Sequence, residues 1–134
     1  MPSANEAIIR RYFDEAVNQG KFDVIDEHFA PDVVFDTPIG QFQGQEGVKQ
    51  LVSGFRGAFS DLYVAVEEVL GDGDRFAVRV TTNGTNDGEL LGNAPTGRSV
   101  KLPFVHFVRF VDGKYGRDHV VYDRLALLEQ LQAT

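Results

Sequence analysis

The segment from Val100 to Asp123 constrains the fold of this 134-residue chain more than any other stretch. Asp112-Gly113 separates two apolar runs, and this dipeptide in that setting is a strong signal for a β-hairpin. Alternate residues of a strand point to the same face, so the first strand places one histidine in a row of five apolar side chains. That row is Val100, Leu102, Phe104, His106, Val108 and Phe110. We therefore expect a hairpin with a titratable side chain on a largely apolar face.

The length of the hairpin loop decides which side chains of the second strand join His106. A two-residue loop puts His106 on one face with His119, whereas a three-residue loop over 111–113 puts it with Asp118 and Val120. The local pattern leaves both possibilities open. A carboxylate and an imidazole on neighbouring buried strands are candidate groups for acid/base catalysis.

The first 60 residues carry the pattern of three helices, expected at 3–19, 22–29 and 45–59, with a short strand at 32–37. Ser3 and Glu6 are spaced as a capping box for the first helix. Further strands are expected at 62–70 and 75–85, and a short helix at 123–131. Helices followed by a run of antiparallel strands indicate the α+β class, here as a single domain over 1–134. A strongly bent sheet around the helices would leave a cavity where a small molecule could bind.

Composition and motifs exclude several classes of function. The chain has no cysteine, which excludes disulfides, thiol catalysis and cysteine metal sites. Its net charge of -7 argues against binding to nucleic acid or anionic lipid. We expect a cytoplasmic protein without a membrane span, because no apolar run is long enough and no signal peptide precedes the first helix. The P-loop-like stretch 92–99 lacks its lysine and neither histidine pair has ligand spacing, so we expect no nucleotide, cofactor or metal.

The chain resembles the SnoaL-like polyketide cyclases, which have the nuclear transport factor 2-like fold. The resemblance covers nearly the whole chain and rests on seven segments: Asn18–Gly20, Ala30–Asp32, Phe59–Asp61, Gly73–Arg75, Gly84–Gly97, Phe110–Lys114 and Asp123–Leu131. It implies a cone in which a bent antiparallel sheet wraps around three N-terminal helices. It also implies the three-residue hairpin loop, with His106, Asp118 and Val120 on the concave face.

The resemblance further implies a cofactor-free enzyme that closes a polyketide ring by aldol condensation. The pocket histidine of the family matches His106, and its aspartate base matches Val120. Asp118 lies two residues earlier on the same face, so we expect a displaced base there. A second histidine of the family falls on Asn86.

Two other enzymes with this fold provide alternative constellations, and neither is complete in this chain. The arginine and two aspartates of limonene epoxide hydrolase match Arg79, Thr81 and Val120. The two aspartates of ketosteroid isomerase match Thr37 and His106.

These matches define the expected site. Asp118 is the expected base, and His106 or Arg79 would stabilise an enolate. Arg79, Thr81 and Asn83 share a strand face that is either solvated or a pocket wall, and the resemblance implies a pocket wall. The expected ligand-binding residues are Tyr12, Phe13, Phe35, Thr37, Phe55, Phe59, Thr81, Asn83 and Val120.

The expected ligand is a small apolar carbonyl compound. A protein that binds such a molecule without catalysis is the first alternative, supported by the valine at position 120. A hydrolase similar to limonene epoxide hydrolase is the second. On the opposite sheet face, Val105, Phe107 and Val121 form an apolar patch that predicts a homodimer.

Overall fold

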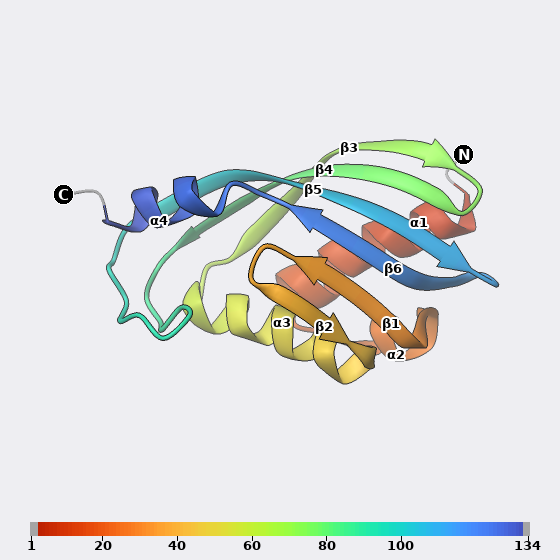
Figure 1. Ribbon diagram of the computed structural model, residues 1–134, viewed down its shortest axis with the longest axis horizontal. Helices are drawn as coiled ribbons and strands as arrows, with labels where there is room; N and C mark the ends of the chain where they lie inside the picture. Colours follow the sequence, from red (N-terminus) through yellow and green to blue (C-terminus); the bar gives the residue numbers. More distant parts are fainter. Residues whose placement is uncertain (1–2, 133–134) are drawn as a thin grey trace.

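The computed structural model describes residues 3–132 and has an α+β fold (Figure 1). The helices are α1 (Ala4–Arg11), which continues into the π-helical segment η1 (Tyr12–Val17), α2 (Asp23–His28), α3 (Gly44–Ala58) and α4 (Arg124–Gln132). The strands are β1 (Phe29–Thr37), β2 (Gly40–Gln43), β3 (Tyr63–Asp72), β4 (Arg75–Thr85), β5 (Ser99–Val111) and β6 (Lys114–Val121). The α+β class predicted from the sequence is confirmed. No helix within 3–132 is long and apolar enough to span a membrane.

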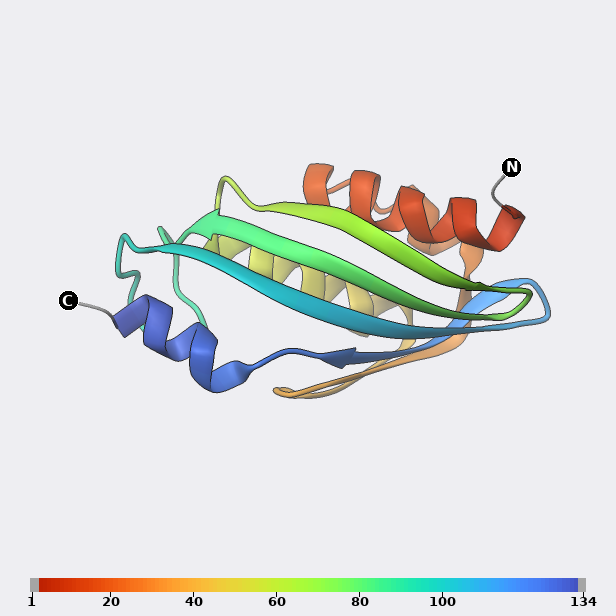
Figure 2. The same ribbon diagram turned by 90° about the horizontal axis from the view of Figure 1, so that it is seen from above.

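One six-stranded sheet, in the order β2-β1-β6-β5-β4-β3, forms the larger layer. Figures 1 and 2 show α1, α2 and α3 along one side of this bent sheet, and α4 at one end of it. Four of its strand pairings are antiparallel, but β1 pairs with β6 in parallel, so the sheet is mixed. The short strand β2 was not expected from the sequence.

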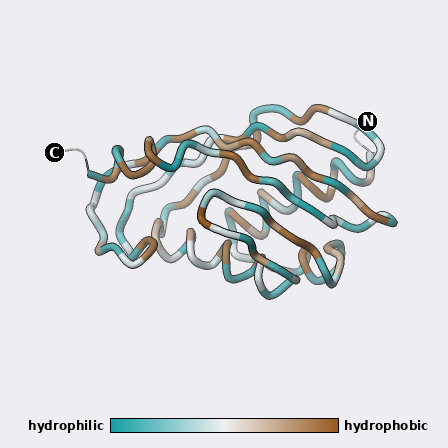
Figure 3. The backbone as a smooth tube through the Cα atoms, in the orientation of Figure 1, coloured by the Kyte–Doolittle hydropathy of each residue, from teal (hydrophilic) through white to brown (hydrophobic). Residues whose placement is uncertain are grey.

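The alternation of side chains along the strands separates the core from the outer face. In β5, every second residue from Val100 to Phe110 is buried, and most of the intervening residues are exposed. Apolar and polar segments accordingly alternate along the strands in Figure 3. The helices therefore pack against one face of the sheet and leave the other face uncovered over much of its area.

The first helix begins where the sequence predicts. The Ser3 hydroxyl accepts a hydrogen bond from the Glu6 backbone N–H at 3.1 Å, as expected of an N-cap. The Glu6 carboxylate binds Arg10 instead of completing the capping box. At the other end, the Asn18 side chain donates to the Val64 carbonyl at 2.9 Å and accepts from the Val64 N–H at 2.7 Å. These bonds fix the end of η1 against β3.

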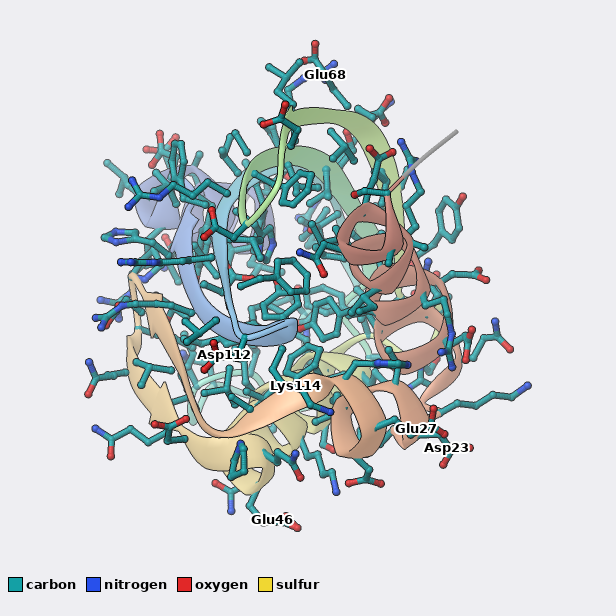
Figure 4. The ribbon with its side chains drawn as sticks, turned by 90° about the vertical axis from the view of Figure 1, so that its right-hand side faces the viewer. Asp23, Glu27, Glu46, Glu68, Asp112 and Lys114 are labelled. Atoms are coloured by element: carbon teal, nitrogen blue, oxygen red, sulfur yellow. The ribbon has the colours of Figure 1, made fainter. Side chains whose placement is uncertain are left out.

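Stacked aromatic rings fill the core beside the β5–β6 hairpin. The ring of Tyr115 lies 4.2 Å from that of Phe29 and 5.8 Å from that of Phe35. Such contacts contribute about 0.5–1.5 kcal/mol each beyond the area they bury. In Figure 4, Lys114 of the hairpin lies beside α2, where its ammonium group donates to the Glu27 carbonyl at 2.8 Å. The hairpin is therefore fixed to the helical layer.

The loop between β4 and β5 is organised by Asn86, which is 1% exposed. Its amide nitrogen donates to the carbonyls of Ala58 and Gly88 at 3.1 and 2.9 Å, and its oxygen accepts from the Thr96 N–H at 2.9 Å. Asn86 occupies the position of a family histidine, but its polar atoms are all used to hold this loop on the end of α3.

We expect Gly88→Ala to destabilise the fold by about 2 kcal/mol or more, because it forces two backbone segments apart. A Cβ atom at Gly88 would overlap the carbonyl oxygen of Gly57. Gly54→Ala is the matched control, since a Cβ atom there meets no heavy atom within 4 Å. In the helix α3 it should stabilise by about 0.5–1 kcal/mol. Chemical denaturation measures the free energy of unfolding of both variants. Equal values for Gly88→Ala and Gly54→Ala would contradict this account of the loop.

Candidate functional site

A β-bulge decides which side chains of β6 face the helices. The turn is the two-residue Asp112-Gly113, with both residues at positive φ, so the expected three-residue loop is wrong. The extra residue is Gly116 instead, because Arg109 pairs with Arg117 while Phe110 pairs with Tyr115. A bulge shifts the side-chain alternation by one residue. Tyr115 and Asp118 consequently both face the core.

The expected position of Asp118 and Val120 beside His106 is therefore correct, although the reason is different. Val120 lies directly opposite His106 in the register of β5 and β6, and Asp118 lies opposite Val108. All three side chains are buried on the concave face. His119 points to the opposite face and is exposed.

A cavity of about 70 Å³, partly open to solvent, lies between the N-terminal helix, α3 and the concave face of the sheet. It is lined by Tyr12, Phe13, Val17, Phe35, Thr37, Ile39, Leu51, Val52, Phe55, Leu62, Val64, Val80, Thr82, Phe104, His106, Val120 and Tyr122. The wall is almost entirely apolar, which is typical of sites for small organic molecules. Six of the residues expected to bind ligand lie in this wall: Tyr12, Phe13, Phe35, Thr37, Phe55 and Val120. Their binding roles remain predictions.

His106 and Asp118 form a buried pair at this cavity. The imidazole Nδ1 lies 2.9 Å from one carboxylate oxygen of Asp118 and 3.1 Å from the other. Asp118 is 0% exposed and His106 is 7% exposed. The Tyr115 hydroxyl donates to the same carboxylate at 2.5 Å, and the Phe13 ring packs edge-on against the imidazole with centroids 4.9 Å apart. These contacts leave the imidazole little freedom to rotate.

The placement of Asp118 corrects its expected role as a base that touches the ligand. Asp118 does not line the cavity, whereas His106, whose Nδ1 contacts the Asp118 carboxylate, does. A carboxylate only accepts hydrogen bonds, so Nδ1 donates to it and Nε2 is the nitrogen left to accept a proton. The arrangement can therefore carry out proton transfer at His106 Nε2, with Asp118 positioning the ring.

Two buried tyrosines adjoin the carboxylate. Burial raises the pKa of Tyr115 well above its usual value, and the negative charge of Asp118 raises it further. The same two causes, in the same order, raise the pKa of Tyr12. Both phenols therefore stay protonated, so Tyr115 remains a donor to Asp118.

The expectation that Arg79, Thr81 and Asn83 line the pocket is wrong. The inward row of β4 is Phe76, Val78, Val80 and Thr82, so residues 79, 81 and 83 point to the opposite face. The Arg79 side chain is 51% exposed and its Nε lies 3.4 Å from Glu68, which points away from the helices in Figure 4. Without Arg79 in the cavity, the epoxide-hydrolase constellation also lacks its arginine.

Two other expected ligand contacts have structural roles. Phe59 is buried and does not line the cavity. It packs against Gly84, where an added Cβ atom would lie 2.9 Å from its ring. Thr37 does lie in the wall, but its hydroxyl donates to the Gly40 carbonyl at 2.8 Å and accepts from the Ile39 N–H at 3.2 Å. Those bonds hold the β1–β2 turn.

Sequence reasoning missed two polar residues of the wall, Thr82 and Tyr122. The alternation of β4 contains the signal for Thr82, because Val78 and Val80 are the apolar neighbours of that position on the same face. Tyr122 lies just beyond β6, and its inward side chain continues the alternation of Asp118 and Val120. Within residues 3–132, no cluster of three or more His, Asp or Glu side chains is arranged to hold a metal ion.

Comparison with known proteins identifies the family. The sequence pattern of the SnoaL-like polyketide cyclases matches residues 7–131. The chain belongs to this family. It is 34% identical over 108 residues to the nogalonic acid methyl ester cyclase of Streptomyces nogalater. The aligned region covers 78% of this chain and 79% of that cyclase.

Solved structures of other proteins have the same fold. A proposed polyketide cyclase from Jannaschia sp. CCS1 superposes with a TM-score of 0.89 at 28% identity, covering 98% of this chain and 93% of the other. AclR from Streptomyces galilaeus, a proposed hydroxylase, gives a TM-score of 0.80 at 31% identity, with coverages of 97% and 82%. Solved structures that this chain resembles thus carry more than one proposed activity on the same fold. The expected nuclear transport factor 2-like architecture is confirmed.

Proposed function

We propose that this SnoaL-like protein is a cofactor-free acid/base enzyme that acts on a small apolar carbonyl compound. The observation that carries the proposal is the buried His106–Asp118 pair at the wall of an apolar cavity. Of the residues known to line this cavity, His106 alone is of a type that exchanges protons near neutral pH. The apolar wall favours a hydrocarbon skeleton over a charged one.

The proposed chemistry starts at a carbon next to a carbonyl group. Nε2 of His106 takes a proton from this carbon, and the C–H electron pair moves into the carbonyl group to give an enolate. The Nδ1–H bond to Asp118 stabilises the imidazolium that results. In a cyclisation, the enolate carbon then bonds to a second carbonyl carbon of the same molecule, and the imidazolium returns its proton to the new alkoxide. In an isomerisation, it returns the proton to another carbon.

The comparisons support cyclisation as the reaction class, since the relative from Streptomyces nogalater is named a cyclase. In this chain, valine stands where the resemblance places the aspartate base of the family. The displaced base is then best assigned to His106 instead of Asp118, because Asp118 does not line the cavity.

A ligand-binding protein without catalysis is the second candidate. It is favoured by one observation: within the described part of the chain, no carboxylate belongs to the cavity wall, and the residue paired with His106 on the same sheet face is Val120. Such a protein would bind the same class of apolar molecule and leave its C–H bonds intact.

Deuterium exchange into a probe ketone distinguishes the two candidates. The probe is 2-tetralone, a small apolar ketone whose C–H bonds beside the carbonyl are acidic. Proton NMR in D₂O should show exchange faster than with the same concentration of free imidazole. A rate equal to that of imidazole would contradict the enzyme and favour the binding protein.

We also propose that the protein is a homodimer through the outer face of the sheet. Phe107 and Val121 are 53% and 47% exposed there, next to the half-buried Val105. An exposed apolar patch of this kind is typical of an interface. Sedimentation at micromolar concentration should give a dimer that Phe107→Glu converts to a monomer. Leu91→Asp, which changes an exposed leucine in the β4–β5 loop, should remain dimeric. A monomeric wild type would exclude the interface.

A further inference from the structure

No protein group within residues 3–132 forms a hydrogen bond with the hydroxyl of Tyr122. Tyr122 is 9% exposed and lines the cavity. Within residues 3–132, its oxygen is the one buried side-chain nitrogen or oxygen atom without a hydrogen bond. A buried tyrosine hydroxyl usually finds a partner, and an unpaired buried donor costs about 1–3 kcal/mol. The hydroxyl at the cavity is therefore available to donate to a bound ligand.

The surrounding rings hold the hydroxyl in place. The Tyr122 ring stacks on Phe104 with centroids 4.1 Å apart and an interplanar angle of 15°. Phe104 in turn packs edge-on against Phe55 of α3, at 6.3 Å. Burial raises the pKa of Tyr122 above its usual value, so the phenol is neutral and can donate. The wall thus presents a fixed, protonated donor.

The position of Tyr122 relative to His106 fits recognition of a ketone. Val120 lies opposite His106, and Tyr122 follows two residues later on the same face. Same-face neighbours on a strand are about 6.5–7 Å apart. His106 and Tyr122 are therefore diagonal neighbours on one sheet face, and side chains in that relation can contact the same small ligand.

We propose that Tyr122 is the oxygen-recognition group of the cavity, which donates a hydrogen bond to the carbonyl or enolate oxygen of an apolar ligand. His106 Nε2 would face the neighbouring carbon of the same ligand. This inference rests on the proposed function for the identity of the ligand, but its test measures binding and does not depend on turnover.

The probes are 2-naphthol, the aromatic counterpart of the enol of 2-tetralone, and naphthalene, which has the same rings without oxygen. Tyr122→Phe should weaken the binding of 2-naphthol about tenfold, the loss of one hydrogen bond. It should change the affinity for naphthalene by less than about twofold. Tyr63→Phe, which alters a tyrosine that is 57% exposed and outside the cavity wall, should change neither.

Thermal unfolding provides a readout that separates ligand recognition from a structural role. Because no protein group within residues 3–132 bonds the hydroxyl, Tyr122→Phe should leave the Tm unchanged or raise it. A lower Tm would show that the hydroxyl already has a structural partner, and it would overturn the proposal. Three binding results would also overturn the proposal. They are an unchanged affinity of Tyr122→Phe for 2-naphthol, an equal loss of affinity for both probes, and a wild type that binds neither probe. If Tyr122→Phe loses the preference for 2-naphthol over naphthalene and the wild type exchanges no deuterium, the recognition role is supported. Only the proposal of an enzyme is then contradicted.

Discussion

Replacing His106 by glutamine is expected to lower the rate of deuterium exchange into 2-tetralone by about a hundredfold or more. Glutamine can fill much of the space and can still form hydrogen bonds, but its amide does not accept a proton at neutral pH. General-base catalysis by a positioned side chain contributes about 10²–10⁴-fold to a rate. Because His106 Nε2 is the proposed proton acceptor, the whole of this contribution should be lost.

His119→Gln is the matched control for this experiment. His119 lies on the same hairpin, directly opposite Phe107, but its side chain is exposed on the outer face. The control should exchange deuterium at the wild-type rate. Circular dichroism must show that the His106 variant is folded. A folded His106→Gln variant with the wild-type rate would remove His106 from the mechanism.

Asp118→Asn is expected to lower the same exchange rate by about a hundredfold, through its effect on the imidazole. The asparagine oxygen can accept from the Tyr115 hydroxyl as the carboxylate does. Its amide nitrogen then takes the place of the other carboxylate oxygen, 3.1 Å from Nδ1 of His106, and donates to Nδ1, so the ring proton moves to Nε2. An imidazole with its proton on Nε2 cannot take another proton at that atom. The same inversion explains why a buried aspartate is needed behind a catalytic histidine in serine proteases.

A double variant tests whether the two residues act as one unit. If Asp118 acts only through His106, the variant with both His106→Gln and Asp118→Asn should be about as slow as the slower single variant. If Asp118 were an independent base, the two losses would multiply. Wild-type exchange in Asp118→Asn would eliminate its positioning role. Equilibrium unfolding of each variant separates these losses from loss of stability, since the Asp118 carboxylate is fully buried.

Local signals in the sequence predicted the elements well because each depends on neighbours in the chain. The Ser3 cap, the Asp112-Gly113 turn and the bounds of β4 follow from backbone preferences and side-chain alternation. The resemblance to SnoaL-like proteins added the arrangement of these elements, which the comparison with known structures confirmed.

The facing of β4 shows where the resemblance misled. The residues Phe76, Val78 and Val80 form an apolar row that burial requires to face the helices. Matching Arg79 to an arginine of another enzyme reversed that facing, and Thr81 and Asn83 were misplaced with it. The hydrophobic pattern alone would have placed Thr82 in the cavity wall.

The sequence by itself determined the class of fold, the helix caps, the hairpin turn and the presence of a histidine on an apolar strand face. Only the tertiary structure decided that Asp118 supports His106 from behind, because this depends on the bulge at Gly116. A three-residue loop and a bulge within β6 both place Asp118 on the same face as His106. Packing across the sheet selects the bulge. The cavity and the unpaired Tyr122 hydroxyl are likewise tertiary. They exist because side chains distant in the sequence meet without filling the space between them.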